Sequence, residues 1–391
     1  MFFRIPLAGL CLVAIVSTLD VNGEQISKTT QFLANAALQA TIEDRYNYVS
    51  SPLAASIILG LVTEGAEGDT KSELLAASGS NELLDKEAYK KVLTSIKGLS
   101  SDGTLQNKVV LKNFVYVYKN YSVHESFAEL AKEYYLADVK SVARPDLEVR
   151  ILQTREDVTN TAFNEHAMLM FNGFSLEMSW PTSTWHRTSV SWDGNVIRAF
   201  GAAGNFALGY VPSVDCTAFK LPYKNTDYSL LVLVPKTKST LDDTLKSLPE
   251  NSIDEITKTL TMKPAFVTMP CFESSNITSF KSVLKEKTKV NRVFTETADL
   301  SNISSDKLYL DDMVQQAGIE VCIDGTSAFS LSSSAFAPQR VIKEYIVVDK
   351  PFVYILYNES NNVILVAGKV EQPNWQETEN NSNTDIETIK M

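Results

Sequence analysis

The most informative stretch of this sequence is NYVSSPLAASIILGLVTEGAEGDT, residues 47–70. Ser51-Pro52 predicts a helix start, because serine can accept a hydrogen bond from a free first-turn amide and proline is tolerated at the first helical position. The helix that follows, Leu53–Val62, is apolar nearly all round, and we expect Gly65 to end it. A helix without a polar face belongs in the centre of a core. With 391 residues and 44% hydrophobic content, the chain can build such a core.

Helix patterns also occur on both sides of this stretch. Thr70-x-x-Glu73 predicts a capping box at the start of the next helix. Apolar residues at helical spacing predict further helices at residues 24–42, 82–97, 125–135 and 281–287.

Strand patterns begin at residues 108–118, KVVLKNFVYVY, and dominate the second half of the chain. This first strand is apolar on both faces, as expected for a central strand that is covered on both sides. Further strands are predicted at residues 167–176, 217–221, 228–234, 265–272, 308–310, 318–322, 345–348, 352–357 and 363–370. Helices first and strands later indicate an α+β fold.

Residues 1–23 have the form of a secretory signal, in which Arg4 precedes the apolar run Leu7–Val16. That run is too short to span a bilayer. We therefore expect cleavage near Gly23 and a soluble, secreted, extracellular protein. The net charge of −11 argues against nucleic acid and anionic membranes as partners. The polar residues 374–391 are expected to form a disordered tail.

The three cysteines outside the signal do not make a disulfide scaffold. Cys216, Cys271 and Cys322 allow one bridge at most, and each lies in an apolar context, so we expect buried, inert thiols. Five Asn-x-Ser/Thr sequons fit a secreted glycoprotein. These glycosylation candidates are Asn120, Asn276, Asn302, Asn358 and Asn380.

Six motifs, in order along almost the whole mature chain, resemble the serpin family of serine protease inhibitors. They are Asn47 with Ser51-Pro52 and Gly65–Thr70; Asn172 followed eight residues later by Trp180; Leu221-Pro222-Tyr223; Ser229–Pro235; Phe294–Ser301; and Lys350-Pro351-Phe352 with Gly368-Lys369-Val370 and Pro373. The resemblance implies one domain over residues 24–373, with about nine helices, three β-sheets and an exposed reactive centre loop at about residues 325–345.

The resemblance also implies a mechanism. A protease attacks the loop and forms an acyl-enzyme, and the cut loop then inserts as a new strand in the main sheet. An inserting strand turns alternate residues toward the core, and Thr326, Ala328, Ser330 and Ser332 are all small. Together with Gly325 and Ser327 they form the predicted hinge. Phe329 and Leu331, on the other face, depart from the alanines usual in the family.

The loop offers two places to cut. Counting from Lys350-Pro351-Phe352 places the reactive bond at Arg340–Val341, whereas counting from Gly325 places it after Gln339. We prefer Arg340–Val341, because arginine suits the pocket of a trypsin-like serine protease. Phe336-Ala337 leaves a papain-like cysteine protease open as the target.

The region where the sheet would open departs from the family at three positions. Ile323 stands where a glutamate is usual and Cys271 where its lysine partner is usual, so we expect an apolar contact between these two residues. Ala54 replaces a serine. By the resemblance, the predicted sheet-opening region comprises Ser51, Ala54, Asn172, Trp180, Cys271 and Ile323.

No enzyme motif competes with this interpretation. The three histidines form no H-E-x-x-H, and there is no Cys-x-x-Cys, G-x-S-x-G or phosphate-binding loop. We expect a monomeric inhibitor that is not an enzyme, needs no cofactor or metal, and has a target protease as its partner. A non-inhibitory serpin-like binding or storage protein is the alternative.

Overall fold

The computed structural model describes residues 9–78, 85–99, 108–118, 121–142, 167–177, 185–223, 226–323 and 344–373, with side chains from Gly23 onward except at a few helix and strand ends. The predicted hinge, the bond Arg340–Val341, Phe336, Trp180, two sequons (Asn120 and Asn380) and the tail lie outside these residues.

The helices occur mostly in the first half of the chain. They are α1 (Gly9–Gln39), α2 (Pro52–Gly65), α3 (Gly68–Ala77), α4 (Lys86–Leu99), α5 (Glu125–Tyr135), α7 (Leu241–Ser247), α8 (Ile253–Lys258) and α9 (Phe280–Lys287). The predicted start of α2 is confirmed, since the Ala54 amide donates to the Ser51 hydroxyl at 3.3 Å. Within the described part of the chain, no helix combines the length and the apolar character needed to cross a membrane.

The capping box predicted at Thr70 and Glu73 is wrong. Helix α3 begins at Gly68, and the Thr70 hydroxyl accepts the Asp299 amide at 2.9 Å. The Glu73 carboxylate accepts the Asn291 and Arg292 amides, both at 2.9 Å. The two side chains tie α3 to a distant segment of the chain, and partners so remote in sequence are invisible to a local pattern.

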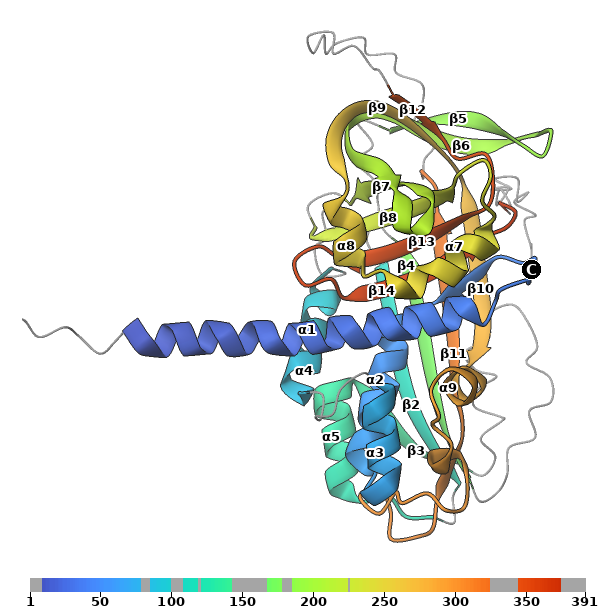
Figure 1. The fold of residues 1–391 in the computed structure, drawn as a ribbon. Coiled ribbons are helices and arrows are strands. Elements are labelled where there is room, and N and C mark those ends of the chain that lie inside the picture. Colours follow the sequence, from blue (N-terminus) through green and yellow to red (C-terminus); the bar gives the residue numbers. More distant parts are fainter. Residues whose placement is uncertain are drawn as a thin grey trace, which may run out of the picture.

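A five-stranded sheet forms one side of the fold (Figure 1). Its order is β10 (Phe272–Ser279), β11 (Tyr309–Val321), β4 (Ala167–Glu177), β2 (Lys108–Tyr118) and β3 (Ala137–Val142). The strands predicted at residues 308–310 and 318–322 are the two ends of β11, whose pattern is interrupted by a register shift between Leu310 and Asp312. Strands β3 and β10 were not predicted.

The remaining strands form a nine-stranded sheet. Its order is β1 (Tyr48–Ser50), β14 (Ile364–Val370), β13 (Phe352–Asn358), β8 (Tyr228–Pro235), β7 (Cys216–Pro222), β6 (Asn195–Val211), β9 (Thr261–Pro270) and β12 (Glu344–Val347), with β5 (Trp185–Trp192) also paired to β6. The 17-residue β6 pairs with β5 and β9 and, at its end, with β7. It therefore joins into one sheet the strands that the resemblance assigns to two.

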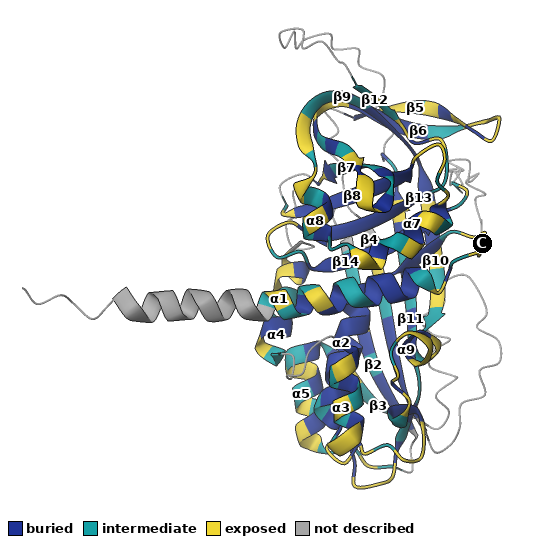
Figure 2. Cartoon of the chain, in the orientation of Figure 1, coloured by how far each residue is buried: buried dark blue, intermediate teal, exposed yellow. Residues whose placement is uncertain are grey.

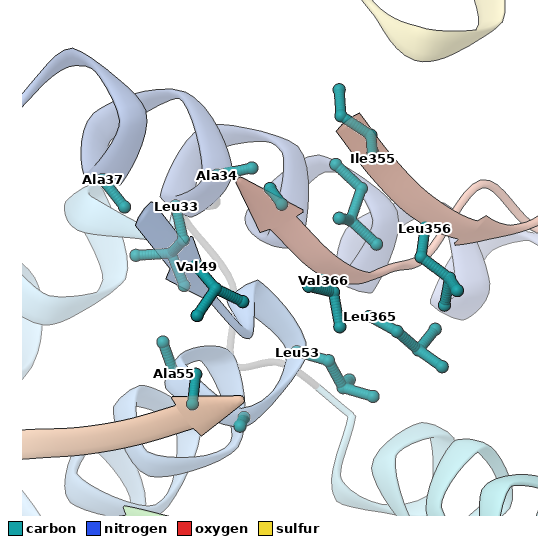
Figure 3. Packing of buried hydrophobic residues seen from close by; sticks show 14 of the residues in the cluster. Leu33, Ala34, Ala37, Val49, Leu53, Ala55, Ile355, Leu356, Leu365 and Val366 are labelled. Atoms are coloured by element: carbon teal, nitrogen blue, oxygen red, sulfur yellow. The ribbon is translucent and has the colours of Figure 1, made fainter. Parts of the chain in front are cut away.

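The core lies where α1 and α2 pack on β14, which is paired with β13 (Figures 1 and 2). Every residue of β13, β14 and β8 is buried. Leu33 of α1, Leu53 of α2 and Leu365 of β14 meet in one cluster, shown in Figure 3. The prediction that the apolar helix after Ser51 occupies the centre of the core is confirmed, since almost every α2 residue is buried.

Candidate functional site

The candidate site is the contact between β4 and β11, which we call the seam. The two strands run parallel, from Tyr309 opposite Ala167 to Ile319 opposite Leu176, and antiparallel neighbours flank them on both sides. A chain that turned back after β11 and entered the seam would run antiparallel to both strands. It would replace one parallel ladder, the weaker kind per residue, by two antiparallel ladders.

The segment able to make that turn starts beside the seam. Residues 324–343 connect Ile323, just after β11, to Glu344 of β12. This connection contains the predicted hinge and is longer than the 11 residues of β4. Its length is therefore sufficient for a full additional strand.

A row of buried amides crosses the seam. The Gln315 amide group of β11 donates to Asn172 Oδ1 of β4 at 3.4 Å, and Asn172 Nδ2 donates to Asn113 Oδ1 of β2. Asn113 in turn donates to the Tyr135 carbonyl oxygen at 2.8 Å. All three amides are at least 98% buried, so these hydrogen bonds are shielded from water.

Gln315 is held more firmly on its own side of the seam. Its Oε1 accepts the Ser51 amide at 2.7 Å, and its Nε2 donates to the Ser51 carbonyl oxygen at 2.9 Å. The seam is therefore crossed in this row by one long hydrogen bond, Gln315 to Asn172, between two well-bonded halves. A neutral hydrogen bond contributes about 1 kcal/mol net, so parting this side-chain contact costs little once the freed amides find new partners.

Of the residues predicted for sheet opening, Ser51 and Asn172 lie in this row. Ala54 contributes its backbone amide to the Ser51 hydroxyl, and its methyl group is fully buried. Sequence reasoning missed Gln315 and Asn113. Asn113 could have been found as the lone amide side chain in a mostly apolar strand, but assigning Gln315 required the strand register.

A disulfide joins Cys271 to Cys322 at the end of β11. This corrects the expectation of inert thiols for these two cysteines. The antiparallel register pairs Phe272 with Val321, so the next residue on each strand extension, Cys271 and Cys322, lies opposite the other. The predicted apolar contact concerned Cys271 and Ile323; the link at this point is covalent and goes to Cys322, while Ile323 is buried in the same apolar cluster.

Cys216 is the cysteine for which the expectation is confirmed. It is free and fully buried, with its Sγ 3.2 Å from the Val214 carbonyl oxygen. Burial raises the pKa of the Cys216 thiol to about 11. Since the thiolate is the nucleophile, this group is unreactive at neutral pH.

Three of the predicted sequons lie in the described residues. Asn302 is exposed, Asn276 is half-buried and accepts the Val49 amide at 2.9 Å, and Asn358 is buried. Asn302 therefore offers the most accessible position for a glycan.

Comparison with known proteins places this chain in a family. The profile described as Serpin (serine protease inhibitor) matches residues 27–160 and 200–373. Mouse neuroserpin is 24% identical over 411 residues, covering 98% of each chain. Serine protease inhibitor 42Dd of Drosophila melanogaster is 26% identical, covering 84% of this chain and 91% of that protein.

A solved structure of a tumour suppressing serpin superimposes with a TM-score of 0.74 at 21% identity, covering 90% of this chain and 100% of that one. This likeness confirms the predicted α+β serpin fold. Because the family profile matches most of the sequence, the chain belongs to the serpin family of serine protease inhibitors and is not itself an enzyme.

Proposed function

We propose that this protein is a secreted, monomeric inhibitor that traps a trypsin-like serine protease as a suicide substrate. The protease serine attacks the Arg340 carbonyl carbon, an ester forms, and the Val341 amine leaves. The segment from Gly325 to Arg340 then inserts into the seam before water can hydrolyse the ester. The observation that carries the proposal is the parallel β4–β11 seam, which lies beside the starting point of a connection long enough to fill it.

The composition of the hinge supports insertion. Small residues at Thr326, Ala328, Ser330 and Ser332 form one alternating face, which suits the closely packed side of a sheet. The buried amide row supports it as well, because only the Gln315 to Asn172 hydrogen bond has to part along that row. An inserted strand carries backbone donors and acceptors of its own to the groups released.

Trapping is tested by incubating the protein with trypsin and separating the mixture on a denaturing gel. We expect an SDS-stable complex containing the Arg340 ester, and a cleaved chain that unfolds at a higher temperature than the intact one. Arg340→Ala should abolish the complex with trypsin. Lys343→Ala, which removes the nearby alternative trypsin site, should leave the complex unchanged.

Two outcomes favour other functions. A stable complex with papain that is lost in Phe336→Ala, without any complex with trypsin, would assign the inhibitor to cysteine proteases. Clean cleavage without a complex with either protease would assign the chain to the non-inhibitory serpin-like proteins. The bulky side chains of Phe329 and Leu331, in the hinge segment, are the reason to test this alternative.

A further inference from the structure

An exposed aromatic strip lies at the end of the molecule that carries β5, β9 and β12 (Figure 1). It consists of His186 of β5, Phe266 of β9 and Tyr345 of β12. Ring centroids are 5.6 Å apart between His186 and Phe266, and 6.3 Å apart between Phe266 and Tyr345. Three strands from different parts of the chain thus contribute to one row of aromatic side chains.

The sheet is built so that these rings can meet on its outer face. Phe266 pairs with Tyr345, and Gly201 of β6 pairs with His186, so the rings project from neighbouring rows. A Cβ on Gly201 would approach the Phe266 ring at 3.3 Å and the Val267 carbonyl oxygen at 3.2 Å. The absence of a side chain at Gly201 therefore lets the Phe266 ring lie across β6 toward His186.

The side chains at the β12 end of the strip are exposed to solvent. Tyr345 is 69% exposed and its neighbour on the same face, Val347, is 47% exposed. Strand β12 also ends the strand order, so its outer edge has no paired strand among the described residues. Exposed aromatic groups beside an unpaired edge are typical of surfaces that bind another protein.

The covalent chain sets how far this strip can lie from the proposed reactive bond. Arg340 and Tyr345 are five residues apart, so their Cα atoms are separated by at most about 18 Å for any path of the intervening residues. A protease–inhibitor interface covers about 800 Å² on each partner, equivalent to a disc of about 16 Å radius. A protease seated on Arg340 therefore has Tyr345 within or at the rim of its footprint.

We propose that the aromatic strip is a second docking surface for the protease, contacting the apolar rim of a trypsin-fold enzyme whose pocket holds Arg340. This inference rests on the proposed function and extends it from the cleaved bond to the described surface. Self-association is the weaker alternative, because the net charge of −11 makes two copies repel each other.

The test uses trypsin whose catalytic serine is replaced by alanine, because such an enzyme binds without cutting. Its affinity is measured for the protein and for Tyr345→Ser, whose exposed position leaves folding intact, as thermal unfolding will verify. We expect about tenfold weaker binding for Tyr345→Ser, the scale of a contributing aromatic contact. Affinity within twofold of the unmodified protein overturns the proposal.

Val196→Ser is the matched control. Val196 is 78% exposed on β6, seven residues from Ala203, which faces Phe266. This separation is about 24 Å along the strand, which places Val196 well away from the strip, so its binding should be unchanged. If Val196→Ser weakens binding as much as Tyr345→Ser does, the effect is general surface stickiness and the proposal fails.

The same measurements separate this proposal from the proposed function. Binding that is lost in Arg340→Ala but unchanged in Tyr345→Ser supports the proposed reactive bond and overturns the docking role of the strip. If binding needs both residues but active trypsin forms no SDS-stable complex, the docking role of the strip is supported and trapping is overturned. A protein that sediments as a dimer, and as a monomer only after Tyr345→Ser, assigns the strip to a second copy and overturns the proposal.

Discussion

The centres of the two sheets are built on opposite principles. In the nine-stranded sheet, β8, β13 and β14 are antiparallel and buried along their whole length; we call this region the apolar centre. In the five-stranded sheet the seam is parallel, and a row of buried amides crosses it. Buried apolar side chains have no hydrogen bonds to exchange with an entering chain, whereas amides and parallel ladders can change partners. Under the proposed function, the first region stays closed and the second opens.

The largest effect is expected from removing the disulfide that lies beside the seam. The bond between Cys271 and Cys322 closes a loop of 51 residues, worth about 4 kcal/mol against the unfolded chain. Cys271→Ala with Cys322→Ala should therefore lower the free energy of unfolding by about 4 kcal/mol in a denaturant titration. The bond joins β10 to β11 and does not cross the seam, so trapping should persist. Loss of trapping in a folded double variant would show that the bond takes part in opening.

The next effect probes the apolar centre. In Gly368→Ala, the added methyl group would overlap the Tyr354 ring and the Tyr48 carbonyl oxygen. Overpacking of this kind costs about 3 kcal/mol, which thermal unfolding would detect. The control is Gly98→Ala in α4, where nothing lies within 4 Å of the new methyl group; there a small gain is expected. Equal stability of both variants would mean that the apolar centre can accommodate an added methyl group at Gly368.

A smaller, pH-dependent effect is expected in the seam. In Gln315→Glu, only a protonated carboxyl can replace the hydrogen bond donated to the Ser51 carbonyl oxygen. Burial raises the folded-state pKa of such a carboxyl, so stability is retained at pH 4 and lost as the pH rises through that pKa. We expect a loss of about 2 kcal/mol at pH 8.

The control for that variant is Gln316→Glu, on the half-exposed opposite face of β11. Its carboxylate can reach water, so its stability should follow that of the unmodified protein from pH 4 to pH 8. Parallel pH curves for the two variants would contradict the role given to Gln315.

The last prediction is that the Cys216 thiol is not alkylated. Cys216 lies in β7, next to β8 of the apolar centre, and the pKa of its thiol is raised to about 11 by burial. Iodoacetamide at pH 8 should leave Cys216 unlabelled in the intact chain and equally unlabelled after trypsin has cut the loop, as mass spectrometry can show. Labelling after cleavage would indicate that opening the seam also disturbs the apolar centre.

Much of the fold could be predicted from local periodicity. Residues 108–118 and 125–135 match β2 and α5 at both ends, because the strand and helix patterns within these two segments are strong. Strand β10, FESSNITS, was missed because polar residues lie on both of its faces, with Ser274 buried and Glu273 exposed, and its identity as a strand comes from pairing with β11. Strand β6 was missed because its glycines and exposed residues obscure the alternation.

The candidate site could be predicted only in part. Motifs identified Ser51 and Asn172, but Gln315 and Asn113 gained meaning when strand register placed them on either side of Asn172. The disulfide escaped prediction for the same reason, since its cysteines are 51 residues apart.

Residue order alone was enough for the start and the burial of α2, the α+β class and the family, because these depend on spacing within a short window or on motifs read in sequence. Pairing across the chain settled the seam, the amide row, the disulfide and the aromatic strip. Each of these needs two or three strands brought together from distant positions, and the register that aligns them arises from packing of the whole core rather than from any single segment.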